Sequence, residues 1–241
     1  MISFIIPTKN EKKIIATTLE KILKYTGPKE IIVSDGNSTD GTIEIIKKYT
    51  DKMLIYSGKE KRQNISQGKN DGAKIATGDY LVFMDADTSV ENPDAFFTKA
   101  ISEFKKDPKL GALTVNIKVL KEFETIGDKI VFGMMNWMNR FYNNVCGIGA
   151  STGEFQMVKR DIFNKVNGFN EAFAAGEDYD LFRRISKLYS TRADPSLTSY
   201  HTGRRAHAIG WPKLLSQWFM NFIYTLFLNK SASSEWGGDI R

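Results

Sequence analysis

Two pairs of acidic residues stand where they could do chemistry. Asp85 and Asp87, separated by one alanine, follow an apolar run, and Glu177 and Asp178 follow a glycine. Paired carboxylates repel each other, and burying them is costly unless a cation neutralises them. Mg²⁺ and Mn²⁺ suit carboxylate oxygens and keep coordination positions for substrate phosphates. Asp85 and Asp87 therefore predict a metal-diphosphate site, although taken alone two solvated aspartates in a loop explain the pattern about equally well.

The apolar run at residues 80–84 predicts a strand that is buried on both faces. Asp85 and Asp87 then lie at its carboxyl end, where open α/β sheets bind their ligands. Similar runs earlier in the chain alternate with segments of helical periodicity, and Asn10 is expected to cap the first helix. This alternation favours a parallel sheet with helices on both faces. The expected strands are residues 2–7, 30–34, 53–56 and 80–84.

The second half of the chain has a looser pattern. A glycine-rich stretch at residues 147–153 lacks phosphate-loop spacing and is expected to be a loop that enters a strand. The other elements follow from hydrophobic periodicity and from turn residues. The expected elements are helices from Pro93, from Asp161, around 181–188 and over 211–228, and strands over 110–120 and 154–158.

The composition limits the class of protein. The 241 residues are 41% apolar and 26% charged, which predicts a packed globular protein rather than disorder. The net charge of +6 favours an anionic partner such as a nucleotide, a lipid phosphate or a membrane surface. Basic and acidic residues are interspersed, so no nucleic-acid partner is expected. The chain has neither a dinucleotide-binding G-x-G-x-x-G after its first strand nor a P-loop.

The cellular setting is constrained by three features. Cys146 is the single cysteine, which excludes an internal disulfide and fits a reducing compartment. The first residues lack the charged region of a secretory signal, and no run of 18 apolar residues is present. We therefore expect a cytoplasmic protein without a spanning helix, and peripheral attachment to the cytoplasmic membrane face is a further hypothesis.

Four segments of the chain form a characteristic set in residue type and order: residues 5–11 (IIPTKNE), 33–42 (VSDGNSTDGT), 78–87 (GDYLVFMDAD) and 166–184, which contains VNGFNE and GEDYDL. Together they resemble the motifs of family 2 glycosyltransferases with the GT-A fold. The resemblance covers roughly residues 1–205 and implies a Rossmann-like, mostly parallel α/β sheet flanked by helices. It also implies a nucleotide-binding half over 1–90 and an acceptor half over 91–205, followed by a C-terminal amphipathic helix and tail over 206–241.

The resemblance implies an activity and a set of site residues. A sugar would pass with inversion from a nucleotide-sugar donor, most readily a UDP-sugar, to an acceptor hydroxyl or a lipid phosphate. Asp178 matches the general base, with Glu177 beside it, and Asp35 matches the acid that accepts from the nucleobase. The implied ligands of a divalent metal, Mn²⁺ or Mg²⁺, are Asp85, Asp87 and His201. The implied donor contacts are Pro7, Thr8, Glu11, Asp35, Gly36, Arg62, Lys69, Asp85, Ala86, Arg204 and Arg205.

These residues also have structural interpretations. Asp35 precedes a glycine and could form an Asx turn. Glu177 and Asp178 could be ordinary acids at a helix start, where the macrodipole favours them and would weaken Asp178 as a base. Nearby acids would raise the pKa of Asp178 instead. His201 could be a hydrogen-bonded surface residue, and the two neighbouring arginines could form a solvated basic face.

The acceptor half contains two segments rich in Met, Phe and Trp, at residues 134–142 and 211–227. In the second, apolar positions recur at helical spacing and are flanked by Lys213 and Lys230. Tryptophans with flanking cations suit a helix in a membrane interface, which would favour a polyprenyl-linked lipid or a lipid-linked glycan as acceptor. Packing of this helix on its own domain, or in a homodimer, explains the stripe at least as well.

Three other classes of protein share features with this sequence. A processive polymer synthase is not expected, because no Q-x-x-R-W follows the domain. An inactive nucleotide-sugar-binding scaffold is the main alternative, and the intact set of Asp85, Asp87 and Asp178 argues against it. A nucleotidyltransferase can also carry paired acids at a strand end, but it would be expected to show a glycine-rich loop after the first strand, where residues 7–10 read PTKN.

Overall fold

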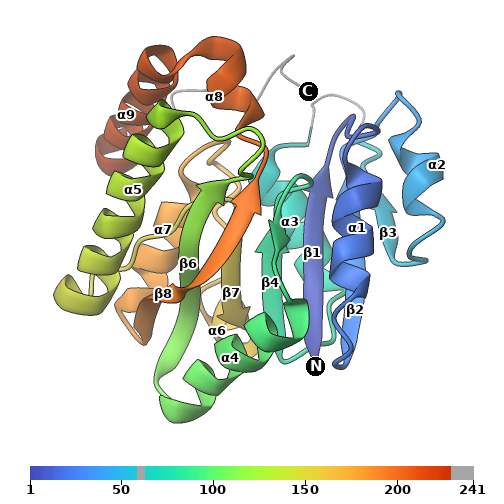
Figure 1. Cartoon of the computed structure of the whole chain (residues 1–241). Helices are drawn as coiled ribbons and strands as arrows, with labels where there is room; N and C mark the ends of the chain where they lie inside the picture. The colour runs from blue at the N-terminus through green and yellow to red at the C-terminus, as the bar shows by residue number, and fades with distance from the viewer. Residues whose placement is uncertain (59–62, 229–241) are drawn as a thin grey trace.

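A mixed β-sheet runs through the molecule and carries helices on both faces (Figure 1). The computed structural model describes residues 1–58 and 63–228. Within these residues the sheet has eight strands in the order β3-β2-β1-β4-β7-β6-β8-β5. The strands are β1 (Ile2–Thr8), β2 (Lys29–Asp35), β3 (Met53–Ile55), β4 (Tyr80–Met84), β5 (Ser89–Val90), β6 (Leu110–Val119), β7 (Phe155–Lys159) and β8 (Ser190–His201). The helices are α1 (Ile15–Leu23), α2 (Thr42–Ile46), α3 (Ile65–Lys74), α4 (Pro93–Lys106), α5 (Ile126–Arg140), the π-helix η1 (Phe141–Cys146), α6 (Arg160–Lys165), α7 (Glu177–Ser186), α8 (Arg204–Ile209) and α9 (Trp211–Leu228).

The first half of the chain forms the parallel part of the sheet, as the sequence predicts. β1 pairs in parallel with β2 and β4, and β2 pairs in parallel with β3. Successive side chains of a strand point to opposite faces. Phe4 and Ile6 therefore pack in the core shared with α1 and α4, whereas Ile5 packs in the core shared with α6 and α7. Because all three side chains are fully buried, the strand reads as a continuous apolar run.

The second half adds antiparallel pairs that the sequence pattern does not reveal. β7 runs antiparallel to β4 and β6, and β5 runs antiparallel to β8. β8 pairs in parallel with β6 over most of its length, with a register shift after Val115. The sequence pattern predicts no strand where β8 lies, because Arg192, Asp194 and Pro195 interrupt any apolar alternation along it.

Asn10 does not cap the first helix, which corrects the sequence-based expectation. α1 begins at Ile15, and its N-cap position is Ile14, without a side-chain hydrogen bond. Asn10 instead has a φ of 55°, a left-handed conformation that Asn tolerates better than most residues. Its Oδ1 accepts a hydrogen bond from the Thr39 backbone N–H at 2.9 Å. The side chain thus joins the loop after β1 to the loop after β2.

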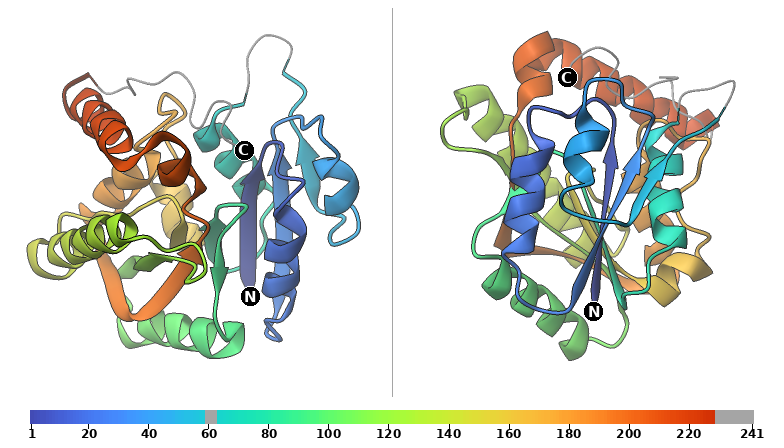
Figure 2. Two further views of the ribbon diagram at one scale, coloured as in Figure 1. Left: turned by 45° about the horizontal axis from the view of Figure 1, so that its top comes forward. Right: turned by 90° about the vertical axis from the view of Figure 1, so that its right-hand side faces the viewer.

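The last two helices, α8 and α9, lie near the carboxyl ends of β6 and β8, on the side of α5 (Figure 2). α9 has the bounds that the sequence predicts. The buried carboxylate of Asp128 in α5 holds this region: His207 Nε2 lies 2.8 Å from Oδ2, and Trp211 Nε1 donates to Oδ1 at 3.1 Å. Over the described residues, no helix is both long and apolar enough to cross a bilayer.

Candidate active site

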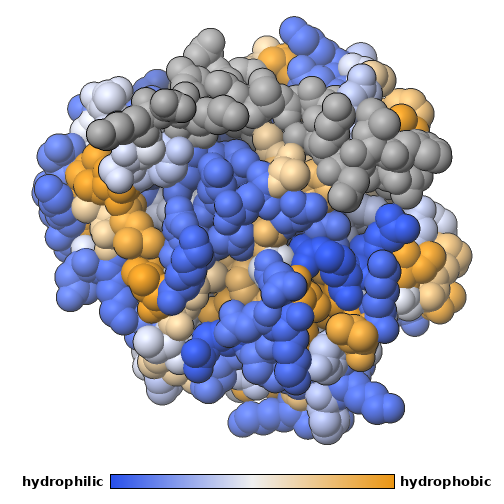
Figure 3. All heavy atoms as spheres, turned by 180° about the vertical axis from the view of Figure 1, so that it is seen from behind, coloured by the Kyte–Doolittle hydropathy of each residue, from blue (hydrophilic) through white to orange (hydrophobic). Residues whose placement is uncertain are grey.

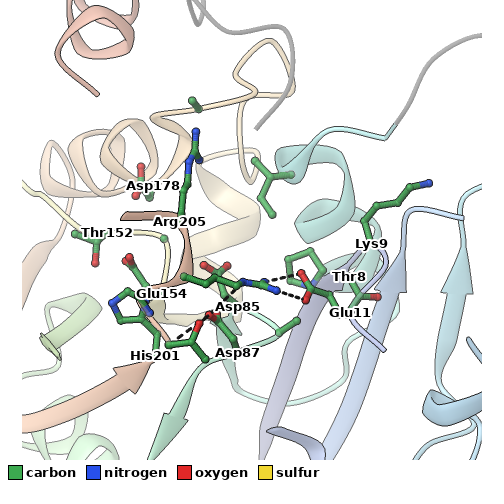
Figure 4. Close-up of a pocket in the computed structure, with 18 of the residues that line it drawn as sticks. Thr8, Lys9, Glu11, Asp85, Asp87, Thr152, Glu154, Asp178, His201 and Arg205 are labelled. Carbon is green, nitrogen blue, oxygen red and sulfur yellow. Dashed lines mark hydrogen bonds and ion pairs between the residues drawn. The ribbon is translucent and has the colours of Figure 1, made fainter. Parts of the chain in front are cut away.

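A large cavity lies where β1, β4 and β8 end, next to α7, α8 and α9. Its volume of about 1410 Å³ exceeds the roughly 300–1,000 Å³ of most small-molecule sites. Figure 4 shows the labelled side chains of Asp85, Asp87, Glu154, Asp178 and Arg205 around it. The lining includes residues 7–14, 85–87, 151–154, 175–179 and 201–208. The site therefore extends past the domain boundary predicted after residue 205.

Asp35 organises the loops on the β1–β2 side of the cavity. Its Oδ2 accepts from Thr8 Oγ1 at 2.9 Å and from Ser38 Oγ at 2.7 Å, and its Oδ1 accepts from the Ser38 backbone N–H at 2.6 Å. Asp35 is fully buried and lies behind the cavity wall, whereas Pro7, Thr8 and Gly36 line it. The contacts of Asp35 are thus those of a loop-stabilising residue, with hydrogen bonds from Ser38 and Thr8. Its contact with a nucleobase stays a prediction.

Glu11 and Arg204 form a bidentate ion pair across the cavity wall. Arg204 Nη1 and Nη2 lie 2.6 and 2.7 Å from the two carboxylate oxygens of Glu11, and Nε lies 3.6 Å from Asp87 Oδ2. Burial pulls the pKa of Arg204 down, but Glu11 and Asp87 outweigh it and raise the pKa above its usual value. This pair fixes the start of α8 against the loop after β1.

Negative charge concentrates at the end of β4. Asp85 follows the last residue of β4, and Figure 4 shows Glu154 beside it and Asp87 below. Burial raises the pKa of Asp85 well above its usual range; Lys69 opposes this shift, and the charges of Glu154 and Asp87 add to it. Glu154 has no role in the sequence analysis, where it only begins a strand. Its contribution depends on the antiparallel placement of β7 next to β4, which no local signal reveals.

His201 ends β8 beside the same acids (Figure 4). Its Nδ1 lies 3.3 Å from the Gly203 backbone N–H, and its ring packs edge-on against Phe132 at 4.8 Å between centroids. Within the described part of the chain, the buried His201 Nε2 and Glu154 Oε2 have no hydrogen-bond partner. Such atoms need an explanation, and an absent ligand is one.

The donor atoms fit a divalent cation by type. Carboxylate oxygens and an imidazole nitrogen are ligands that Mn²⁺ accepts, and Asp85, Asp87 and His201 all line the cavity. Asp87 Oδ2 already accepts hydrogen bonds from Thr202. No three Asp, Glu, His or Cys side chains are gathered as a metal site in residues 1–58 and 63–228. A cation here would therefore need further ligands from the substrate or from water.

Asp178 lies at the second position of α7 and faces the cavity. Its Oδ1 accepts from the Tyr179 backbone N–H at 2.8 Å. Burial and the charge of Glu177 raise the pKa of Asp178 to about 7, even though Lys69 and the backbone hydrogen bond act in the opposite direction. A carboxyl group with this pKa can accept a proton near neutral pH.

Lys69 is placed differently from its predicted role as a diphosphate contact. Its ammonium is fully buried, lies 2.9 Å from Glu177 Oε1, and does not line the cavity. One carboxylate oxygen of Glu177, the residue predicted beside the base, is thus paired with Lys69. The physical reason is that a buried charge needs a partner, and Glu177 at the start of α7 lies within reach of the Lys69 ammonium. Arg62 lies outside the described residues.

The remaining predicted residues line the cavity. Ala86 lies between the two aspartates in sequence, and Arg205 of α8 lines the cavity (Figure 4). Arg205 Nη2 also donates to Gln217 Oε1 at 3.3 Å, and burial lowers the pKa of Arg205. Sequence reasoning missed other lining residues, because their positions depend on how distant segments pack: Gln63, Asn64, Thr152, Trp211 and Trp218.

Comparison with known proteins agrees with this geometry. Residues 3–166, more than half of the chain, match the family model described as Glycosyl transferase family 2. The chain belongs to this family. Among curated relatives, the poly-beta-1,6-N-acetyl-D-glucosamine synthase of Staphylococcus epidermidis is 34% identical over 128 residues, and that of Staphylococcus aureus (strain COL) is 34% identical over 129. Each match covers 52% of this chain but only 31% of the relative, so it reaches less than a third of those proteins.

Solved structures show the same GT-A fold as this family 2 chain. Mannosyltransferase PcManGT from Pyrobaculum calidifontis, in complex with GDP-Man and Mn²⁺, has a TM-score of 0.72 at 19% identity and covers 96% of this chain and 65% of its own. S. aureus TarS 1-349, in complex with UDP-GlcNAc, has a TM-score of 0.62 at 20% identity and covers 97% and 68%. The predicted fold class, an α/β sheet of GT-A type flanked by helices, is confirmed.

Proposed function

We propose that this chain transfers a sugar from a nucleoside-diphosphate sugar to an acceptor hydroxyl or lipid phosphate, with inversion. The observation that carries the proposal is that one cavity holds both Asp85 and Asp87 and, from the other half of the chain, Asp178 with a pKa raised to about 7. Leaving-group stabilisation and proton acceptance are the two demands of this transfer. Membership of family 2 supports the same reaction class.

A UDP-sugar is the proposed donor. The curated relatives are named as synthases of an N-acetyl-D-glucosamine polymer, and the TarS structure contains UDP-GlcNAc, whereas the mannosyltransferase structure contains GDP-Man. In this chain the wall formed by Pro7, Thr8 and Gly36 would contact the nucleoside. The diphosphate would lie nearer the acids, with Arg205 as a cation on the cavity wall.

Mn²⁺ or Mg²⁺ is the proposed cofactor, and Asp85, Asp87 and His201 are its proposed ligands. When bound, such an ion offsets the charge that develops on a departing diphosphate. The effect of Glu154 and Asp87 on Asp85 supports a cation: their charges add to the burial that raises its pKa, and such repulsion is costly to bury without a cation. Arg204 would limit how far Asp87 can turn, since its Nε lies 3.6 Å from Asp87 Oδ2.

Asp178 is the proposed general base. It would take the proton of the acceptor hydroxyl as oxygen attacks the anomeric carbon from the face opposite the diphosphate, which inverts the configuration. Burial raises the pKa of Asp178 most, Glu177 raises it further, and the positive charge of Lys69 lowers it again. The Lys69–Glu177 pair thereby contributes to the pH at which Asp178 can accept a proton.

The test is release of nucleoside diphosphate from UDP-GlcNAc, UDP-glucose and GDP-mannose, with Mn²⁺ and a lipid extract as acceptor source. We expect release from one donor class, and a loss of roughly 10²–10⁴-fold in Asp178→Asn. No release from any donor by a folded protein that still binds nucleotide would favour an inactive, nucleotide-sugar-binding scaffold instead.

A further inference from the structure

The outer face of α5 and η1 carries an exposed apolar stripe. Its members are spaced four, four, three, four and four residues apart, which places them on one side of the helix. Their exposed fractions range from 41% to 77%, so these large side chains lie in solvent. The stripe consists of Ile126, Ile130, Met134, Trp137, Phe141 and Val145.

Packing of the opposite face fixes this orientation. Val131 and Phe132 are buried, and Asn136 forms two hydrogen bonds of 2.9 Å with the backbone of Ile117 in β6. Thr125 and Asp128 form a capping box at the start of α5, and Asp128 also accepts a hydrogen bond from Trp211 Nε1 of α9. The helix therefore cannot rotate to bury the stripe without breaking these contacts.

Few charges lie on this face. Among the exposed residues from Ile126 to Ile148, Lys129 is the one charged side chain. Its Nζ lies 3.6 Å from Glu124, which precedes the stripe together with the exposed Glu122. Seen from behind, polar residues cover most of the molecule, and apolar residues gather mainly toward the edges of that view (Figure 3). An apolar face with aromatic rings and little charge suits a lipid surface. The net charge of +6 adds an attraction to anionic lipids.

The stripe is continuous with the apolar end of the cavity. Phe123 lines the cavity, is 51% exposed and precedes the stripe by three residues. From the inner face of α5, Phe132 and Met135 line the same wall, and Trp211 and Trp218 of α9 add to it. Apolar side chains thus extend from the exposed stripe of α5 and η1 into the cavity that contains Asp85, Asp87 and Asp178.

We propose that α5 and η1 lie on a lipid bilayer surface and that an amphiphilic acceptor enters the cavity from it, past Phe123. The second part rests on the proposed sugar transfer, whereas the lipid contact does not. The acceptor class is a lipid with a polar head: the head would reach Asp178 and Arg205, and the apolar chain would lie along Phe132, Trp211 and Trp218. This explains a cavity of about 1410 Å³, which leaves room beside a nucleotide-sugar.

Flotation of the full chain with vesicles tests the contact. The vesicles are phosphatidylcholine with or without phosphatidylglycerol, and the variant is Ile130→Ser with Trp137→Ser, at positions 66% and 58% exposed. We expect binding that is stronger with phosphatidylglycerol, and a loss of about tenfold or more in this variant. The matched control is Leu23→Ser with Leu188→Ser, which removes two exposed apolar side chains elsewhere and should float like the wild type.

Two results would overturn the proposal. One is no flotation of the wild type, or equal flotation of the stripe variant. The other is a dimer, detected by light scattering, that the stripe variant abolishes while no vesicle binds, because the stripe would then contact a second copy. A thermal shift with UDP and Mn²⁺, measured in parallel, should be equal in all variants. Its absence alongside normal flotation would contradict the proposed function and leave the lipid contact supported.

Discussion

Lys69 of α3 and Glu177 of α7 form an ion pair inside the protein, with Nζ 2.9 Å from Oε1. Nζ also lies 5.0 Å from the centroid of the Phe169 ring. Burial lowers the pKa of Lys69, but the charges of Glu177, Asp85 and Asp178 outweigh it and keep the pKa above its usual value. Lys69 is therefore a cation held beneath the acids of the site, and it offsets part of their repulsion.

Lys69→Met should destabilise the fold by about 3–5 kcal/mol, because it leaves the buried charge of Glu177 without its partner. Adding Glu177→Leu should restore much of this stability, since both charges are then gone. Urea denaturation measures both changes. The control is Lys74→Met on the same helix, whose exposed pair with Asp71 should be worth about 0–1 kcal/mol. Equal losses in the single and double variants would contradict an ion pair.

The pH dependence of turnover should report Asp178. Its pKa is raised to about 7, and a base accepts a proton only when deprotonated. At saturating donor, kcat should therefore rise with pH through about 7 and fall about tenfold per unit below it. Initial rates of nucleoside-diphosphate release measure this profile. A profile that stays flat across about pH 5–8 would mean that another group accepts the proton.

Glu30 of β2 should make stability depend on pH. Burial raises its pKa, but hydrogen bonds from Lys52, Ser3 and Thr77 outweigh this and lower the pKa to about 2. Because the folded pKa is depressed, the stabilisation is complete above the unfolded value of about 4.5 and is lost as the pH falls toward about 2. Glu30→Gln should cost on the order of 1–3 kcal/mol at pH 6 and almost nothing near pH 2. Thermal unfolding across this range measures it, and a constant difference would contradict it.

The first half of the chain could be predicted from the sequence because local patterns determine it. Phe4, Ile5 and Ile6 read as a strand buried on both faces, and the parallel pairing of β1 with β2 and β4 agrees with the strand–helix alternation. The acids at 85 and 87 could be placed at a strand end for the same reason. The second half of the chain gives weaker signals, because charged residues interrupt β8 and β7 runs antiparallel.

Pairing between distant residues could not be predicted. Nothing in the sequence around Lys69 distinguishes an ammonium that faces a ligand from one that faces Glu177, 108 positions away. Glu11 and Arg204 are 193 positions apart, and their pairing depends on how α8 lies over the end of β1. Helical spacing places Trp211 in an amphipathic stripe, but its Nε1 donates to Asp128 Oδ1 and its side chain lines the cavity.

The most direct measurement is a thermal-shift comparison of the wild type with Asp87→Ala, using UDP, UDP-GlcNAc, GDP and GDP-mannose with and without Mn²⁺. A ligand that binds the native state raises the melting temperature by mass action. We predict a shift in the wild type that requires both one nucleotide class and the metal, and its loss in Asp87→Ala. No shift with any nucleotide, or an equal shift in the variant, would contradict a metal-dependent donor site at the end of β4.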